Sequence, residues 1–271
     1  MPFSPPQVQA FLDLVREKWG YDFSGYAEAS LNRRLRRVAE LAHTQSLEKL
    51  GKRLQADPHA FEWFLENFTV NVTEMFRDPE FYMYLRKHVF PALETFPHIN
   101  IWHAGCSTGE EVYSMAIMLH ESGLLPRCRL YATDINPANL EKARAGIVPT
   151  QMLKEYIQNY RLSGGVEDFT QYYTALYGNA IFQKELRDKI TFLQHNLVAD
   201  GVFNEFHLIV CRNVFIYFKR NLQEQVLEQF AESLAPLGYL ALGTKESILS
   251  ARIQSRFEVA SRPLKIYRKK Y

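Results

Sequence analysis

The sequence predicts a doubly wound α/β fold that is preceded by a small all-helical domain. Residues 6–70 show only helical periodicity, whereas from residue 99 onward apolar runs typical of buried strands alternate with helical segments. A glycine-bracketed turn, Gly105 to Glu111, follows the first of these runs, Ile99 to Ala104. A strand, a glycine turn and a helix in this order form the local geometry with which such folds hold a nucleotide-like ligand.

Helical spacing of apolar residues defines the N-terminal elements. We expect a helix over 6–19 that Gly20 ends, a helix over 24–42, and two short helices within 47–68. In the second helix, Leu31, Leu35 and Val38 share one side. The rest of its surface is basic, through Arg33, Arg34, Arg36 and Arg37. Residues 1–70 are therefore predicted to form a helical domain and residues 71–271 the α/β domain.

The elements of the α/β part follow in chain order. The pattern predicts a helix over 78–93 with Pro79 in its first turn, a strand over 99–104, a helix over 109–122, a strand over 129–133, a helix over 137–145, strands over 190–195 and 206–211, a helix over 222–234, a strand over 239–242, and a closing hairpin of 257–260 and 264–267. Residues 150–189 break the alternation and are predicted to be a variable insert with a helix near 151–160.

Composition excludes several classes of protein. A net charge of +2, from 32 basic and 30 acidic residues, gives no general attraction to nucleic acid. No apolar run reaches the length of a transmembrane helix and no signal peptide begins the chain, so we expect a cytoplasmic protein without membrane insertion. Cys106, Cys128 and Cys211 are odd in number, which suits a reducing compartment, and neither they nor the histidines show metal-ligand spacing. We predict no metal.

The charge of the glycine turn constrains the ligand. A helix N-terminus attracts anions, but Glu110 and Glu111 already occupy this one and would repel the pyrophosphate of a dinucleotide. A dehydrogenase is therefore disfavoured. A ligand with an adenosine and a cationic amino group fits better, and S-adenosylmethionine is the commonest of that kind.

Polar residues at strand ends are the candidates for binding it. Asp134 ends the second strand, where an acid can hold a ribose diol, or it could simply cap the following helix. The segment Asn71 to Asp78 either orients a ligand or supplies helix caps. Asn213 and Tyr217 follow another strand, although Tyr217 could be a core aromatic, and Asn196 with Leu197 could face an adenine or form an Asn turn.

Cys106 invites a nucleophile hypothesis. A catalytic cysteine needs a base, and the sequence places no histidine to serve this one. We therefore expect a packing role for Cys106.

Five segments in order resemble the chemotaxis-receptor methyltransferases of the CheR type. They are Asn71 to Arg77, Gly105 to Ser114, Ala132 to Ile135, His195 to Leu197, and Cys211 to Phe218. The resemblance runs nearly end to end and includes the helical start. It implies a Rossmann-like class I S-adenosylmethionine-dependent methyltransferase fold. The implied reaction is methyl transfer to glutamate carboxylates on chemoreceptors, which gives glutamyl methyl esters and S-adenosylhomocysteine.

The resemblance also implies roles for single residues. The expected cofactor-binding residues are Asn71, Thr73, Arg77, Glu110, Asp134, Asn196, Leu197, Arg212 and Asn213. Glu110 would face the methionine end of the cofactor and Asp134 its ribose. We further expect Arg77 and Tyr217 to orient the substrate carboxylate or that of the cofactor.

One departure from the family concerns receptor tethering. Members that dock onto a C-terminal receptor pentapeptide carry a Gly-x-Gly-x-x-x-Gly loop in an inserted β-subdomain, whereas the corresponding segment here, Ser163 to Phe169, lacks that spacing. We therefore expect the enzyme to act without the tether.

Receptor methylation regions are glutamate-rich cytoplasmic helices, so the four arginines of the second helix are expected to dock them, unless they form only a solvated face. Two other functions stay open. The chain could be a methyltransferase for another substrate, or a non-catalytic S-adenosylmethionine-binding module in signal transduction.

Overall fold

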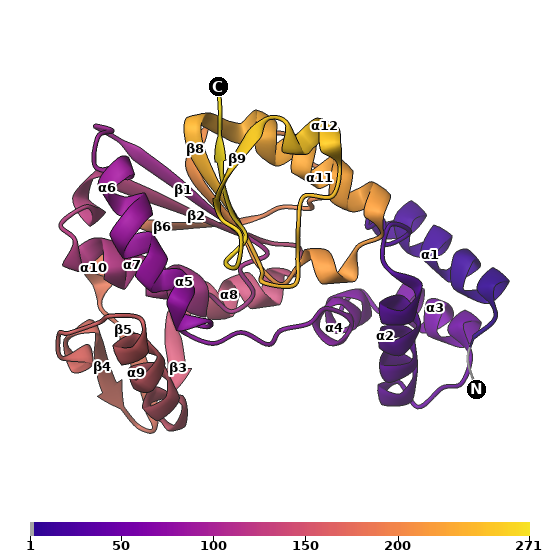
Figure 1. Cartoon of the computed structure of the whole chain (residues 1–271). Helices are drawn as coiled ribbons and strands as arrows, with labels where there is room; N and C mark the ends of the chain where they lie inside the picture. Colours follow the sequence, from indigo (N-terminus) through magenta and orange to yellow (C-terminus); the bar gives the residue numbers. More distant parts are fainter. Residues whose placement is uncertain (1–2) are drawn as a thin grey trace.

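The computed structural model describes residues 3–271, and its first four helices gather at one end of the molecule (Figure 1). They are α1 (Pro5–Trp19), α2 (Glu28–Leu41), α3 (Leu47–Ala56) and α4 (Ala60–Phe68). The expected helix over 24–42 begins only at Glu28, because Tyr26 forms an antiparallel bridge with Phe218. This bridge ties the start of α2 to the α/β part of the chain.

A seven-stranded sheet forms the centre of the molecule. Its strands are β1 (Ile99–Ala104), β2 (Cys128–Asp134), β6 (Ile190–Gln194), β7 (Phe206–Cys211), β8 (Leu234–Leu242), β9 (Phe257–Ser261) and β10 (Ile266–Lys269), in the order β6-β2-β1-β7-β8-β10-β9. The first five in that order are parallel, and β10 is antiparallel to both of its neighbours. Strand order reverses between β1 and β7, and open α/β sheets bind ligands at the carboxyl ends of strands at such a point.

The strand predicted over 239–242 is longer than expected. β8 begins at Leu234, and the register of its pairing with β7 shifts between Phe206 and Leu208. The Pro236 to Gly238 segment suggests a turn in the sequence, but a bulge-like irregularity keeps it in the strand.

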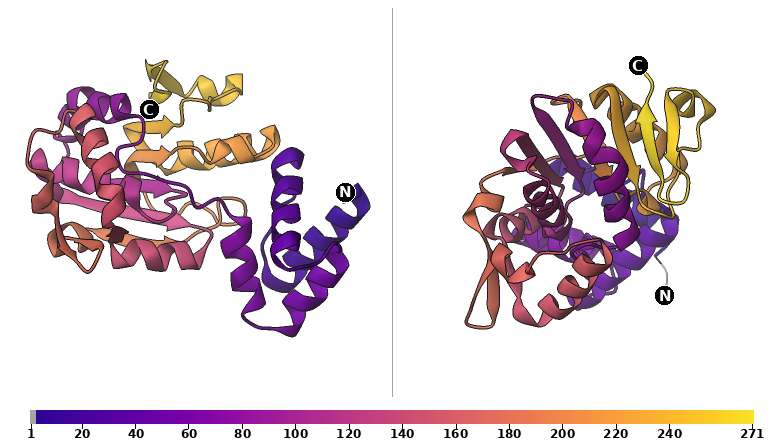
Figure 2. Two further views of the ribbon diagram at one scale, coloured as in Figure 1. Left: turned by 90° about the horizontal axis from the view of Figure 1, so that it is seen from below. Right: turned by 60° about the vertical axis from the view of Figure 1, so that its left-hand side comes forward.

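Helices cover both faces of the sheet (Figure 2). They are α5 (Pro79–Tyr84), α6 (Phe90–Leu93), α7 (Glu110–Glu121), α8 (Pro137–Ala145), α10 (Lys184–Arg187), α11 (Arg220–Ser233) and α12 (Ala251–Gln254), with a π-helical turn over Leu85–Val89 joining α5 to α6. Because side chains alternate along a strand, Ile99 and Ile101 face the core beneath α5 to α8, whereas Trp102 and Ala104 face the core of α11. This second core continues into the N-terminal helices.

The insert forms a separate small layer. It contains β3 (Ile147–Pro149), α9 (Leu153–Leu162), β4 (Tyr173–Leu176) and β5 (Asn179–Phe182), and the three strands pair antiparallel in the order β3-β5-β4. Glu121, at the end of α7, accepts hydrogen bonds from the hydroxyls of Tyr160 and Tyr172. This carboxylate is therefore one of the contacts between the insert and the main domain, beside the apolar core that the two share.

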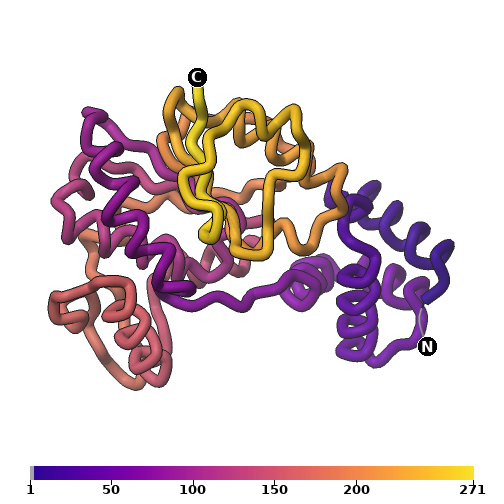
Figure 3. The backbone as a smooth tube through the Cα atoms, in the orientation of Figure 1, coloured from indigo at the N-terminus to yellow at the C-terminus, as the bar shows by residue number. Residues whose placement is uncertain are grey.

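An extended segment, residues 69–78, connects α4 to α5 along the outside of the fold (Figure 3). It is the covalent link between the helical start and the α/β part, in addition to the bridge between Tyr26 and Phe218, and it crosses the side where β1 and β7 end. Within the described part of the chain, no helix is long and apolar enough to cross a membrane.

Candidate active site

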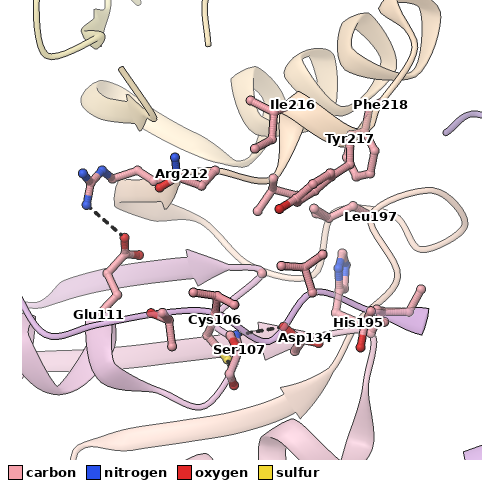
Figure 4. A pocket seen from close by; sticks show the side chains of 18 of the residues that line it. Cys106, Ser107, Glu111, Asp134, His195, Leu197, Arg212, Ile216, Tyr217 and Phe218 are labelled. Carbon is pink, nitrogen blue, oxygen red and sulfur yellow. Dashed lines mark hydrogen bonds and ion pairs between the residues drawn. The ribbon is translucent and has the colours of Figure 1, made fainter. Parts of the chain in front are cut away.

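A cavity of about 320 Å³ lies where the strand order of the sheet reverses, and residues from six separate parts of the chain line it (Figure 4). This volume is at the lower end of the range for small-molecule sites. All but two of the ten residues that the sequence singles out line the cavity: Thr73, Arg77, Asp134, Asn196, Leu197, Arg212, Asn213 and Tyr217. Asn71 and Glu110 do not.

The floor of the cavity is the turn between β1 and α7. Gly105 has φ +77°, and a Cβ there would lie 2.6 Å from Val214, so the turn needs glycine at this position. The backbone N–H of Ser107 donates to Asp134 at 2.8 Å, and Asn136 donates to its other oxygen at 2.9 Å. The helix cap of α8 is Asn136, so the capping role considered for Asp134 is wrong. Burial raises the pKa of Asp134, against the effect of these backbone donors.

The two glutamates of the glycine turn point in different directions. Glu110 accepts from Thr108 at 2.6 Å and bonds Tyr156 of the insert, so its carboxylate lies outside the cavity lining. Glu111 lines the cavity instead, 3.0 Å from His103 and 3.3 Å from Arg212. Burial acts to raise the pKa of Glu111, but the bonds and charges of His103 and Arg212 outweigh it and lower that pKa.

Arg212 anchors the wall that faces this turn. Its guanidinium pairs with Glu111 and with Asp78 at 2.5 Å, donates twice to the carbonyl of Arg77 at 3.2 Å, and lies over the ring of Phe81. Asp78 is the N-cap residue of α5, as the alternative for it had it, and its backbone carbonyl accepts from the N–H of Phe81. Its side chain makes no capping hydrogen bond and pairs with Arg212 instead. Arg212 lines the cavity, but its hydrogen bonds are to protein groups that fix the segment carrying Thr73 and Arg77.

Asn71 has a similar supporting position. Its side-chain oxygen accepts from Asn139 at 2.9 Å and from Thr69 at 3.0 Å, and its amide donates to the carbonyl of Glu66. It fixes the start of the connecting segment rather than lining the cavity.

Arg34 is the main correction to the sequence prediction. It was expected on the exposed basic face of α2, but it is 6% exposed and lines the cavity. Its guanidinium lies 4.2 Å from the centre of the Tyr217 ring and 5.8 Å from that of Tyr26. Arg33, Arg36 and Arg37 are exposed, as expected.

A further side of the cavity is formed by the segment that follows β6. The side chain of Asn196 accepts from the N–H of Val198 at 3.0 Å, which is the Asn turn considered above, and this turn places Asn196 and Leu197 in the cavity lining. Cys106 lines the floor, but burial raises the pKa of its thiol well above the usual value, so it stays a thiol.

The lining has unsatisfied polar atoms that suit a polar ligand. Within residues 3–271, Ser107 Oγ, His195 Nδ1 and the Nε and Nη2 atoms of Arg34 are buried without a hydrogen-bond partner. Buried polar groups are rarely left unpaired, so a ligand with hydroxyl, amino and carboxylate groups would complete this site. Sequence reasoning missed Ser107, His195, Arg34 and Glu111 as lining residues, although Ser107, His195 and Glu111 stand next to or within the segments it singled out.

Comparison with known proteins adds independent information. A model described as the CheR methyltransferase SAM binding domain matches residues 71–265, and one described as its all-alpha domain matches residues 6–69. The chain is 46% identical over 263 residues to Cher3 of Pseudomonas putida, covering 97% of this chain and 96% of that protein. It is 32% identical to the chemotaxis protein methyltransferase of Listeria innocua, covering 89% of each. With that of Escherichia coli the identity is 33%, covering 83% of this chain and 78% of the relative.

Among solved structures, the glycopeptide N-methyltransferase MtfA complexed with sinefungin matches 63% of this chain and 50% of its own, with a TM-score of 0.38 and 11% identity.

Proposed function

This chain belongs to the CheR methyltransferase family, and from that premise we propose that it methylates glutamate side chains of chemoreceptors, with S-adenosylmethionine as methyl donor. The observation that carries the proposal is the cavity itself. It has an acid for a ribose, Asp134, on its floor and Tyr217 on the opposite side (Figure 4). The cationic Arg34 also lines the cavity and packs against Tyr217. Asp134 would bind the ribose of a nucleoside on the floor, and Arg34 would attract an incoming carboxylate near Tyr217.

The residues of the site would act by positioning. S-adenosylmethionine supplies a methyl group on a sulfonium centre. A glutamate carboxylate is ionised at neutral pH, so none of the lining residues has to act as a general base. We assign Asp134 to the ribose, Asn196 and Leu197 to the adenine side, and Thr73 with Glu111 to the amino-acid end. Methyl transfer requires the acceptor oxygen to lie about 3 Å from the methyl carbon. Residues that hold the two reactants in this geometry can lower the barrier by several kcal/mol.

Arg34 and Arg77 are the cations that we assign to carboxylates. Arg34 keeps its charge in spite of burial, which lowers its pKa, because a guanidinium is protonated far above neutral pH. Two of its nitrogens are unpartnered within the described residues, and the guanidinium packs on Tyr217. This supports a role in receiving the substrate carboxylate, which the sequence did not suggest for it.

The test is transfer of labelled methyl groups to a receptor fragment, followed by mild base. Release of the label by base identifies an ester, whereas an N-methyl product keeps it. Arg77→Ala and Tyr217→Phe should each reduce turnover by about 10-fold or more, because both remove a group that orients a reactant. Lys245→Ala, outside the cavity lining, is the control. Wild-type rates in both site variants would remove Arg77 and Tyr217 from the mechanism.

Tight binding of S-adenosylhomocysteine without turnover on any receptor fragment would favour the non-catalytic alternative instead.

We further propose that Arg33, Arg36 and Arg37, the exposed basic face of α2, dock the acidic receptor helix. Their side chains lie around one shallow depression. Charge reversal, Arg33→Glu with Arg36→Glu, should weaken receptor methylation strongly at low salt and less at high salt, because salt screens exposed charges. Binding of S-adenosylhomocysteine should not change.

The matched control for this experiment is Lys18→Glu with Lys49→Glu, which reverses two exposed charges on α1 and α3. An unchanged salt dependence in the α2 variant, or an equal effect in the control, would contradict docking through α2.

Tether independence stays a prediction. The segment Ser163 to Phe169 lies between α9 and β4, and the turn between β4 and β5, Tyr177 and Gly178, has a single glycine. The absence of a Gly-x-Gly-x-x-x-Gly spacing throughout 147–189 supports the proposal, and calorimetry with a receptor pentapeptide tests it. We likewise propose that the two domains of the chain meet at residue 70. The family models that match residues 6–69 and 71–265 support this boundary.

A further inference from the structure

The loop that follows β7 is held by a buried carboxylate from a different part of the chain. Glu246, just after β8, is 4% exposed and accepts from the N–H of Asn213 at 3.1 Å and of Ile216 at 3.3 Å. It also accepts from Gly243 at 2.6 Å, which closes its own turn. Glu246 does not line the cavity, but Asn213 and Ile216 do.

The geometry around this carboxylate is tight. A Cβ on Gly243 would lie 2.7 Å from Oε2 of Glu246 and 2.9 Å from the nitrogen of Asn213. Asn213 itself has φ +63°, a left-handed conformation that costs energy in a residue with a side chain. The Glu246 carboxylate stabilises this strained turn by accepting the N–H of the same residue. The next residues along the loop are Val214 to Phe218, which include Tyr217.

Electrostatics argues against a role in stability alone. Burial raises the pKa of Glu246, and the groups that act in the opposite direction are all backbone N–H donors, of Gly243, Asn213, Ile216 and Phe215. The ionised form of Glu246 is therefore less favourable in the folded protein than in water, because no basic side chain among residues 3–271 forms an ion pair with it. An apolar side chain would fill this place at less electrostatic cost, but it could not accept the hydrogen bonds from the amides of Asn213, Ile216 and Gly243.

We propose that Glu246 is a positioning residue for methyl transfer, which fixes the backbone of 213–216 so that Asn213 and Tyr217 stand at the right place in the cavity. This assignment rests on the proposed function. It concerns the wall that Figure 4 shows above the cavity, not the floor that Asp134 and Ser107 form. Glu246 acts through the loop and touches no reactant.

The test is Glu246→Gln. Oε2 accepts from Asn213 and Gly243, and Oε1 accepts from Ile216, so an amide in either orientation sets its NH₂ group against at least one backbone donor. Glu258→Gln is the matched control, because it removes the same charge from an exposed position on β9. Turnover and KM with a receptor fragment, calorimetry with S-adenosylhomocysteine, thermal unfolding, and amide hydrogen exchange are measured on the full chain.

We expect kcat of Glu246→Gln to fall roughly 10- to 100-fold, because small misplacements of reacting groups have effects of that size. Amides 213, 216 and 243 should exchange faster, while the thermal midpoint and the protection of β1 and β7 stay near wild type. S-adenosylhomocysteine affinity should change by only about threefold, because the floor is intact.

A kcat within twofold of wild type would overturn the assignment. A fall in kcat matched by loss of protection across the sheet would also overturn it, since Glu246 would then act on global stability. Absence of turnover in the wild-type protein would overturn the proposed function and this assignment together, whereas wild-type turnover with an unaffected variant overturns only the assignment.

Discussion

Asp134→Ala should lower the affinity for S-adenosylhomocysteine by about 100-fold or more. A carboxylate that accepts from two ribose hydroxyls makes two charge-assisted hydrogen bonds, each of about 1.5–3 kcal/mol, and 1.4 kcal/mol is a factor of ten in affinity. The substitution also removes the acceptor for the N–H of Ser107, which shapes the floor of the cavity. Titration calorimetry on the purified chain measures the effect.

Two comparisons make this result specific. Asp134→Asn should lie between wild type and alanine, because one oxygen remains but the NH₂ group must face the backbone donor of Ser107 or Asn136. Asp188→Ala removes an exposed acid whose partner is Lys184, and it should leave the affinity unchanged. An Asp134→Ala protein that is folded and binds within threefold of wild type would show that Asp134 does not hold the ribose.

Arg212→Met should lower the free energy of unfolding by about 3–5 kcal/mol, because removing one partner of a buried ion pair leaves the other uncompensated. The Arg212 side chain is 2% exposed and stands between Glu111 and Asp78, so its loss leaves two carboxylates beside each other. It also frees the carbonyl of Arg77. Urea unfolding at neutral pH measures the change. The control is Arg220→Met, which removes an exposed ion pair with Glu224 and should lower the free energy of unfolding by less than about 1 kcal/mol.

The role of Glu111 in this network can be separated by a double variant and by pH. Adding Glu111→Gln to Arg212→Met should recover part of the loss, because one of the two unbalanced charges is gone. The folded-state pKa of Glu111 is lowered, so its contribution is present above its ordinary pKa and is lost as pH falls through the lowered value. The stability difference between wild type and Glu111→Gln should therefore be largest at neutral pH and shrink below about pH 4.5. A difference that is constant with pH would exclude the ion pair.

The sequence predicted the main elements because their signals are local. Apolar runs such as Ile99 to Ala104 and the helical spacing of α1 lie within a few residues of one another, and the structure has both with nearly the expected bounds. The start of β8 could not be predicted, because Pro236 to Gly238 has the composition of a turn, and the strand continues across it only because Leu234 and Tyr239 on either side pair with β7. The start of α2 depends in the same way on the bridge between Tyr26 and Phe218.

The sequence indicated which segments approach the cavity, but not which of their side chains point into it. Glu110 and Glu111 are adjacent at the N-terminus of α7, but only Glu111 lines the cavity, since Thr108 and Tyr156 bind Glu110 on the other side. Arg34 differs from Arg33 and Arg36 only in its angle around α2, and that angle directs it toward Tyr217. Glu246 carried no sequence signal, because its partners are backbone amides from residues about thirty positions earlier.

By itself the sequence determined the class of fold, the family, the cofactor and the segments that approach it, because these depend on short patterns in a fixed order. The glycine-bracketed turn, the acid at the end of β2 and the segment after β7 are such patterns. Only the tertiary structure decided which side chains of those segments face the cavity and which support it from behind. The reason is that the position of each side chain depends on contacts between elements far apart in the chain. Examples are the contacts of Arg34 with Tyr217, of Arg212 with Asp78, and of Glu246 with Asn213.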